Sequence, residues 1–220
     1  MDKIIIFGTT NHSHMIRRII EKEKAAEVVA YTINKKFMSK DGFFEYEGYP
    51  VIPFEEVERY FEPSKYKILN TIGYTKMNEI RREKNEECLR KGYDLFTFVS
   101  KDAIVFSEIT GFGNIVMPGA YIGTNVTLGV GNIIYSGCTL THDIQIGNYS
   151  FLAAGCTIGG NVNIGNNCFL GLNSTIKNSV NIADFSLIGA ATYISKDTQK
   201  YGIYVPERSK KLEKSSLEIW

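Results

Sequence analysis

A six-residue repeat runs without interruption through the second half of this 220-residue chain and constrains its fold more than any other feature. Every sixth position from Val116 to Ile194 is Val, Ile or Leu, 14 times in succession. The next residue is glycine in seven of these repeats, and the fourth residue after the aliphatic is mostly small. Such a period is the signature of a parallel β-helix, in which three repeats form one triangular coil of about 18 residues. The repeats therefore predict a prism of about four coils with the aliphatic side chains inside.

The distribution of charge indicates that a different architecture precedes the repeats. Residues 1–100 carry 33 charged side chains, residues 101–194 carry six, and the last 26 residues carry ten. We therefore predict an α/β domain over residues 1–100, a β-helix domain over 101–195, and a tail or cap over 196–220.

The first hundred residues alternate strand-like and helix-like patterns, which is typical of a small parallel α/β sheet. Apolar runs predict strands at Lys3–Phe7, Glu27–Thr32, Lys67–Ile72 and Leu95–Val99. Amphipathic patterns and Pro or Gly boundaries predict helices at His14–Lys24, Phe54–Phe61 and Met77–Lys91. We interpret the charged stretch Arg81–Glu87 as a solvated face of the last helix.

Composition excludes several classes of protein. A formal net charge of +1 gives no electrostatic basis for binding nucleic acid or an anionic membrane surface. No apolar run approaches the ~18 residues of a membrane span, and the N-terminus lacks the pattern of a signal peptide, so we expect a cytoplasmic protein. The four cysteines form no CxxC pair, which indicates neither a zinc site nor a dithiol motif. Three of them occupy the small position of the repeat, where we interpret them as apolar fillers.

His142 is the one histidine among the repeats. It lies two residues after the aliphatic Leu140, at a corner of the predicted coil, so its ring should face outward. Asp143 follows it directly, and a carboxylate beside an imidazole fixes its tautomer and raises its basicity. Residues 18 apart stack in neighbouring coils, which places Gly160 beside His142 and leaves room for a substrate and for an N–H that stabilises an oxyanion. The alternative is an exposed corner histidine without a role.

A second candidate site lies in the first domain. Residues 8–14, Gly-Thr-Thr-Asn-His-Ser-His, follow a predicted strand and precede a predicted helix, a geometry suited to binding phosphate. The motif is not G-x-G-x-x-G, so it does not favour a dinucleotide. Gly73 ends the third predicted strand, at the edge where such sheets bind ligands. The alternatives are a plain turn capped by Thr, Asn and Ser, and a glycine needed only for a turn.

The repeat resembles that of the hexapeptide-repeat acyltransferases, whose prism is a left-handed β-helix. With its preceding α/β half the chain is similar to the bacterial nucleotide-sugar N-acetyltransferases, including enzymes of UDP-linked 4-amino sugars and of GDP-perosamine, and to sialic acid O-acetyltransferase-like proteins. The resemblance implies a Rossmann-like N-terminal domain and acetyl-CoA as co-substrate, without a metal. It implies N-acetylation of a nucleotide-linked amino-deoxy sugar for bacterial surface glycans. It also implies a homotrimer with the acyl-CoA groove between neighbouring prisms.

The same resemblance implies individual roles. His142 corresponds to the general base and Asp143 to its acidic partner, Gly160 to the glycine whose amide binds the acetyl carbonyl, and Leu172 to a position that lines the acyl-CoA groove. Phe151 stands where a compared relative has a second histidine, and we expect it near acetyl-CoA. The residues expected to bind the nucleotide sugar are Gly8, Thr10, Asn11, His12, Asn34 and Gly73, with Asn34 where relatives have acidic residues.

Other functions use similar scaffolds. O-acetylation of a sialic acid or another sugar hydroxyl would need the same prism and histidine. A carbonic anhydrase on this prism needs three histidines around zinc, whereas the repeat contains one. A non-enzymatic β-helix that only binds or supports has no need of His142, Asp143 and a stacked glycine.

Overall fold

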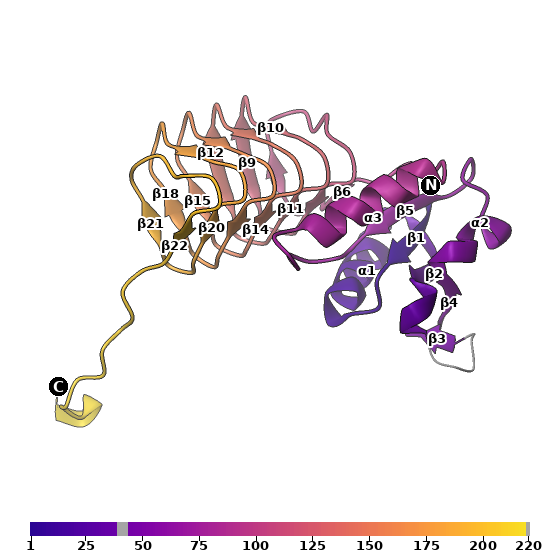
Figure 1. The fold of residues 1–220 in the computed structure, drawn as a ribbon, viewed down its shortest axis with the longest axis horizontal. Coiled ribbons are helices and arrows are strands. Elements are labelled where there is room, and N and C mark those ends of the chain that lie inside the picture. Colours follow the sequence, from indigo (N-terminus) through magenta and orange to yellow (C-terminus); the bar gives the residue numbers. More distant parts are fainter. Residues whose placement is uncertain (39–43, 219–220) are drawn as a thin grey trace.

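The computed structural model describes residues 1–38 and 44–218 and shows an α/β unit attached to one end of a β-helical prism (Figure 1). The first unit contains the elements β1 (Lys3–Phe7), α1 (Asn11–Glu23), β2 (Glu27–Ile33), η1 (Lys35–Phe37), β3 (Phe44–Tyr46), β4 (Tyr49–Pro53), η2 (Phe54–Glu56), α2 (Val57–Tyr60), β5 (Lys67–Asn70) and α3 (Glu79–Arg90). Its strands form one sheet in the order β3-β4-β2-β1-β5. None of the helices in these described ranges is long and apolar enough to cross a bilayer.

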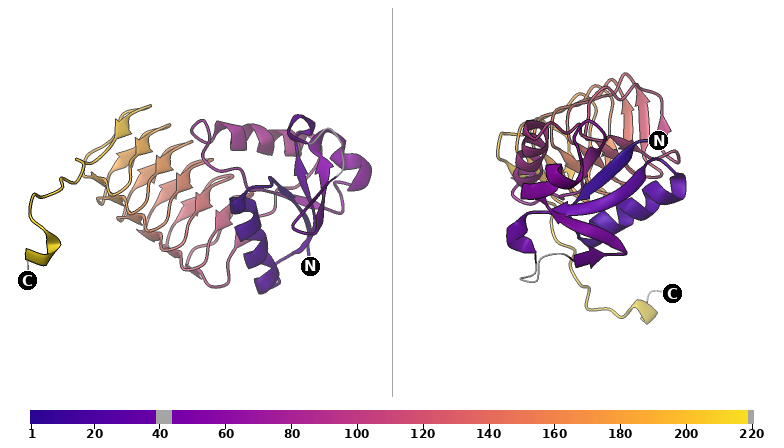
Figure 2. Two further views of the ribbon diagram at one scale, coloured as in Figure 1. Left: turned by 90° about the horizontal axis from the view of Figure 1, so that it is seen from below. Right: turned by 90° about the vertical axis from the view of Figure 1, so that its right-hand side faces the viewer.

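Alternation along β1 explains how the first sheet is covered on both sides, because neighbouring strand residues point to opposite faces. Ile4 and Ile6 pack into a cluster with Ile16 and Ile20 of α1, and this cluster extends onto the prism. Ile5 and Phe7 point the other way, into a cluster with residues of η2, α2 and α3. The helices α1 and α3 therefore lie on opposite sides of the sheet (Figure 2).

Two expectations for this sheet were incomplete. The hairpin of β3 and β4 is not among the predicted strands, and its antiparallel pair forms one edge of an otherwise parallel sheet. The predicted strand Leu95–Val99 was wrong as a member of this sheet. Only an isolated bridge joins Leu95 to Ile68, whereas β6 (Phe98–Val99) pairs with β8 (Ile115–Val116) and opens a face of the prism.

The prism consists of three parallel sheets whose paired residues lie 18 apart along most of its length. The first face contains β6, β8, β11 (Ile133–Ile134), β14 (Phe151–Leu152), β17 (Phe169–Leu170), β20 (Leu187–Ile188) and β22 (Ile203–Tyr204). The second face contains β7 (Ile104–Val105), β9 (Tyr121–Thr124), β12 (Thr139–His142), β15 (Thr157–Ile158), β18 (Thr175–Ile176) and β21 (Tyr193–Ile194). The third face contains β10 (Thr127–Leu128), β13 (Gln145–Ile146), β16 (Asn163–Ile164) and β19 (Asn181–Ile182).

The interior confirms the predicted pattern. All 14 aliphatic positions of the repeat belong to one buried cluster, and none is more than 5% exposed. Cys138, Cys156 and Cys168 are also fully buried within it. Their role as fillers of the prism is therefore confirmed.

The first face differs from the other two in its outward residues, which are large and apolar where the other faces mostly carry Thr, Asn or Gln. Ile115 and Ile133 are fully buried under the α/β unit, and Phe151 is 6% exposed. Further along the same column Ile203 is 70% exposed. The α/β unit thus covers only the beginning of this face, and the chain leaves the far end of the prism in an extended tail that ends in η3 (Ser216–Glu218) (Figure 1).

Candidate active site

The corner that follows β12 presents His142 and Asp143 to solvent. The Nδ1 atom of His142 lies 2.8 Å from Oδ2 of Asp143, and both side chains are about half exposed. Asp143 adopts the left-handed conformation with φ 52°, which Asp and Asn tolerate better than most residues. Asn125, 18 residues earlier and also left-handed, donates a hydrogen bond to Oδ1 of Asp143. The fold of the corner itself therefore holds the carboxylate against the imidazole.

Hydrogen bonding makes Asp143 a stable anion. The bonds from His142 and then from Asn125 hold the pKa of its carboxyl below the ordinary value. Since an ionised carboxylate only accepts, Nδ1 of His142 carries the proton and Nε2 is left with a lone pair. This tautomer can take a proton from a substrate.

Gly160 provides the space beside the ring. A Cβ at this position would lie 2.5 Å from Nε2 of His142, so any side chain here would displace the ring. The backbone N–H of Gly160 donates no hydrogen bond to any residue in the described ranges. The structure therefore places an N–H without a described partner in the coil next to the imidazole, as the spacing of 18 predicted.

The carboxyl edge of the first sheet contains a hollow of about 410 Å³, which we call the turn hollow. It is lined by Gly8, Thr10, His12, Ser13, Thr71, Ile72, Gly73, Tyr74, Thr75, Tyr135 and Phe151. Four of the six residues predicted to bind a nucleotide sugar, Gly8, Thr10, His12 and Gly73, are thus brought together. Thr10 also caps α1 in a reciprocal capping box with Ser13, so the capping interpretation of the turn holds as well.

His12 is the polar group of the turn hollow with an unused hydrogen-bonding atom. Its Nδ1 lies 2.9 Å from the carbonyl oxygen of Thr71 and must donate to it, while the buried Nε2 has no partner in the described structure. The ring stacks on Tyr135 of the prism with centroids 5.6 Å apart. Burial lowers the pKa of His12, the bond to Thr71 opposes that effect, and the charge of Arg81 lowers the pKa further. His12 is therefore a neutral acceptor at physiological pH.

The other two predicted nucleotide residues do not line the turn hollow. Asn34 donates to Oε1 of Glu55 over 3.1 Å, and the N–H of Lys35 donates to Oε2 of the same carboxylate. Asn11 is exposed in the first turn of α1. Their roles toward a nucleotide stay predictions.

A second hollow of about 380 Å³, the apolar hollow, continues from the turn hollow along the first face of the prism. The two share Tyr74, Tyr135 and Phe151, and the apolar hollow adds Ala153, Ala154, Phe169, Gly171, Leu172 and Ala190. Tyr74 packs against Phe151 and Phe169 at centroid distances of 5.2 and 4.6 Å. Phe151 and Leu172, both expected near acetyl-CoA, lie here, and Leu172 is 54% exposed.

The predicted residues therefore occupy two places on one chain. His142, Asp143 and Gly160 lie at the corner between the second and third faces, whereas both hollows lie on the first face. A single prism does not bring the two groups together.

Phe151 was predicted from the sequence, whereas Tyr74, Tyr135, Phe169 and Arg81 were not. An available signal was the residue before every third aliphatic, which is Ile, Phe or Leu from Ile115 to Leu187 and marks the covered face. The interpretation of Arg81–Glu87 as a solvated face is wrong for Arg81 and Asn85, which are each 1% exposed. The guanidinium of Arg81 points into the junction with the prism.

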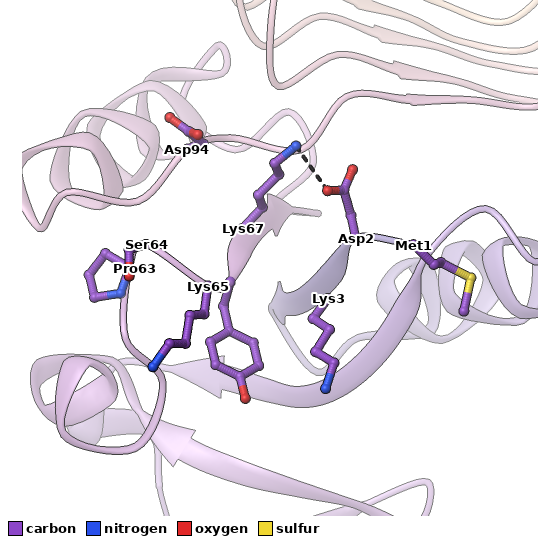
Figure 3. Close-up of a pocket in the computed structure, with 9 residues that line it drawn as sticks. Met1, Asp2, Lys3, Pro63, Ser64, Lys65, Lys67 and Asp94 are labelled. Atoms are coloured by element: carbon purple, nitrogen blue, oxygen red, sulfur yellow. Dashed lines mark ion pairs between the residues drawn. The ribbon is translucent and has the colours of Figure 1, made fainter.

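A third hollow, of about 440 Å³, lies at the amino ends of the strands of the first sheet, opposite the turn hollow (Figure 3). Its lysines are paired: Lys67 with Asp2 at 3.1 Å, Lys65 with Glu62, and Lys3 with Glu27. These pairs compensate the positive charge, so nothing favours an anion there.

All four cysteines lie buried within the described residues. No group of three His, Cys, Asp or Glu residues there could hold a metal ion. Burial raises the pKa of Cys168 to about 11 and that of Cys88 to about 12, which disfavours the reactive thiolates.

The comparisons with known proteins agree with this architecture. Residues 143–178 match the family model described as "Bacterial transferase hexapeptide (six repeats)". The acetyltransferase domain of PglB from Neisseria gonorrhoeae superimposes with a TM-score of 0.82 at 22% identity, over 96% of this chain and 100% of that one. PerB from Caulobacter crescentus, solved with CoA and GDP-perosamine, gives 0.82 at 21% identity over 94% and 95%. WeeI from Acinetobacter baumannii gives 0.76 at 17% identity over 93% and 94%. No curated protein sequence matches the chain.

The chain shares the fold of these three structures. Its parallel sheets and six-residue repeats fit a left-handed β-helix, and the similarity extends through the α/β unit because nearly the whole of each chain is covered. The resemblance to nucleotide-sugar N-acetyltransferases stated from the sequence is thereby confirmed at the level of the fold.

Proposed function

We propose that this protein transfers the acetyl group of acetyl-CoA to the amino group of a nucleotide-linked amino-deoxy sugar, in the biosynthesis of a bacterial surface glycan. The observation that carries the proposal is the His142–Asp143 pair with the N–H of Gly160 in the coil beside it. The full-length similarity to PerB, whose structure contains CoA and GDP-perosamine, supports the choice of substrates.

The proposed chemistry uses one base and one oxyanion donor. Acetyl-CoA supplies the acetyl group as a thioester. The neutral amine forms the new C–N bond, and Nε2 of His142 accepts the proton that the nitrogen loses. The Gly160 N–H donates to the carbonyl oxygen while it carries negative charge. The C–S bond then breaks, and the imidazolium returns the proton to the departing thiolate. Asp143 stabilises the imidazolium in between.

The two hollows fit the remaining parts of the substrates. The turn hollow, at the start of α1, suits the diphosphate of the sugar nucleotide. The apolar hollow suits the sugar and the thioester end of the acyl donor, with Leu172 and Phe151 as its walls.

A homotrimer completes the site in this proposal. The catalytic corner and the hollows lie on different edges of one prism, so His142 of one subunit would act on a sugar held by its neighbour. The acyl-CoA groove then lies between prisms.

The test measures thiol release from acetyl-CoA with UDP-, dTDP- and GDP-linked amino sugars. Turnover with one amino sugar, reduced at least ~10²-fold by His142→Ala, is the expected result. Thr124→Ala alters the corner one coil earlier and should leave the rate unchanged. Turnover only with sugar hydroxyls would replace N-acetylation by O-acetylation. Absence of turnover with every acceptor would favour a binding scaffold.

A further inference from the structure

Arg81 of α3 is a buried cation at the wall of the turn hollow. It is 1% exposed, and its five N–H groups make five hydrogen bonds to carbonyl oxygens. The acceptors belong to two segments, the loop after β5 and the corners of the prism: Ile72, Gly73, Gly131, Tyr149 and Ser150, at 2.6 to 3.3 Å.

No carboxylate neutralises this guanidinium. Its partners are all backbone carbonyls, and no ion pair with a described acidic residue accompanies them. Burial lowers the pKa of Arg81, yet a guanidinium stays protonated at physiological pH. An uncompensated positive charge is therefore fixed inside the molecule.

The turn hollow lies directly in front of that charge. Ile72 and Gly73 belong to a loop that lines the hollow. The carbonyl oxygens of the same two residues accept hydrogen bonds from Arg81. The charge reaches His12 as well, since it contributes to the lowered pKa of that residue.

The lining of the hollow carries no full positive charge of its own. Neither Lys nor Arg is among its lining residues, and the first turn of α1 carries no acidic residue that would repel an anion. A diphosphate bound there would have the N-terminal amides of α1 and a neutral His12 at hand, and Arg81 behind the wall.

We propose that Arg81 supplies the positive charge that attracts the diphosphate of the substrate into the turn hollow, and that it holds the Ile72–Gly73 loop in place for binding. This inference rests on the proposed function, because it presumes a sugar nucleotide in that hollow. Arg81 acts through the loop and through its field, so it is a positioning residue and not a catalytic one.

The test compares two variants that both lose the five-donor guanidinium and differ in charge. Calorimetry of UDP, dTDP and GDP binding should show that Arg81→Gln weakens the preferred diphosphate at least about tenfold, whereas Arg81→Lys stays within about threefold of the wild type. Affinity for acetyl-CoA should be unchanged in both. Arg82→Gln, at the partly exposed neighbour, is the matched control.

A second measurement detects the effect of the Arg81 charge on His12 in the absence of ligand. NMR titration should show a higher pKa of His12 in Arg81→Gln and an unchanged one in Arg81→Lys. If Arg81→Gln does not fold, Arg81→Lys should still be stabilised against heat by the diphosphate as the wild type is. Equal losses in both variants, or full affinity in Arg81→Gln, would overturn the role of the charge while leaving the proposed function standing. Failure of the wild type to bind any of the diphosphates would overturn both.

Discussion

The imidazole of His142 lies directly over Gly160 of the next coil, so close that a Cβ on the glycine would be 2.5 Å from Nε2. Gly160 does not have a positive φ, so its backbone conformation permits other residues. The need for glycine at this position comes from the ring above it.

Gly160→Ala should therefore displace the catalytic imidazole. Because the methyl group and Nε2 cannot occupy the same space, we expect kcat to fall about 10²-fold or more. The half-exposed ring can turn into solvent, so the free energy of unfolding should fall by no more than about 1 kcal/mol. The measurement is steady-state kinetics together with urea denaturation.

The double variant His142→Ala/Gly160→Ala supplies the control for this clash. Removal of the ring should restore most of the lost stability and none of the activity. Stability losses that simply add in the double variant would show that the alanine conflicts with something other than the imidazole.

Asp143→Asn tests the carboxylate at constant backbone geometry, since Asn also tolerates the left-handed φ of 52° at this corner. The neutral amide neither fixes the tautomer of His142 nor stabilises its protonated form. We expect kcat to fall about 10- to 100-fold while KM for both substrates changes little. Asn125→Gly, which removes the donor to Asp143 but keeps the left-handed turn and the charge, should have a much smaller effect. A rate in Asp143→Asn equal to that of the wild type would exclude a role for the pair.

The repeat predicted the prism and the pairing of His142 with Gly160 because each coil obeys a local rule. One aliphatic per strand must be buried, and parallel stacking at 18 residues follows from three strands per coil. The hairpin of β3 and β4 was also accessible, since Glu47 and Gly48 form its two-residue turn, both with positive φ. A two-residue turn is a weaker sequence signal than the alternation of the longer strands and helices.

Burial of Arg81 could not be predicted in the same way. Its neighbours in sequence are charged and typical of a solvated helix, and its five acceptors lie on loops up to 69 residues away. Carbonyl oxygens have no sequence signature, because every residue carries one. The same holds for the turn hollow, where Tyr135 meets His12 only because the α/β unit covers the first face of the prism.

Leu172→Asp should weaken binding of acetyl-CoA. Leu172 is exposed at the rim of the apolar hollow, so a charge there disturbs the surface and not the interior. We expect KM for acetyl-CoA to rise about tenfold, because an apolar contact is lost and a carboxylate faces the polyanionic substrate. Leu212→Asp in the tail, at 67% exposure, introduces the same charge on another exposed leucine. Equal KM values in the two variants would remove Leu172 from the acyl-CoA groove.

Acid should destabilise the fold through His12. Its pKa is lowered in the native state by burial, opposed by the bond to Thr71 and assisted by the charge of Arg81, while the unfolded chain titrates near the ordinary value of 6.5. Between the lowered native value and 6.5 the unfolded state binds more protons, so the free energy of unfolding decreases as the pH falls through this window. Above the ordinary pKa of 6.5, the stability that the neutral His12 contributes is fully retained.

Urea denaturation at pH 7.5 and pH 5.0 measures that loss. His12→Gln has no titrating group at this position, so the free energy of unfolding should drop less between the two pH values than it does in the wild type. All other titrating groups, Asp143 included, are shared by the two proteins and cancel in the comparison. Identical losses in the wild type and His12→Gln would mean that the imidazole takes up its proton without cost in the native state. That outcome is inconsistent with the surroundings of the ring. The imidazole stacks on Tyr135 near the charge of Arg81, and its Nε2 is buried without a described partner.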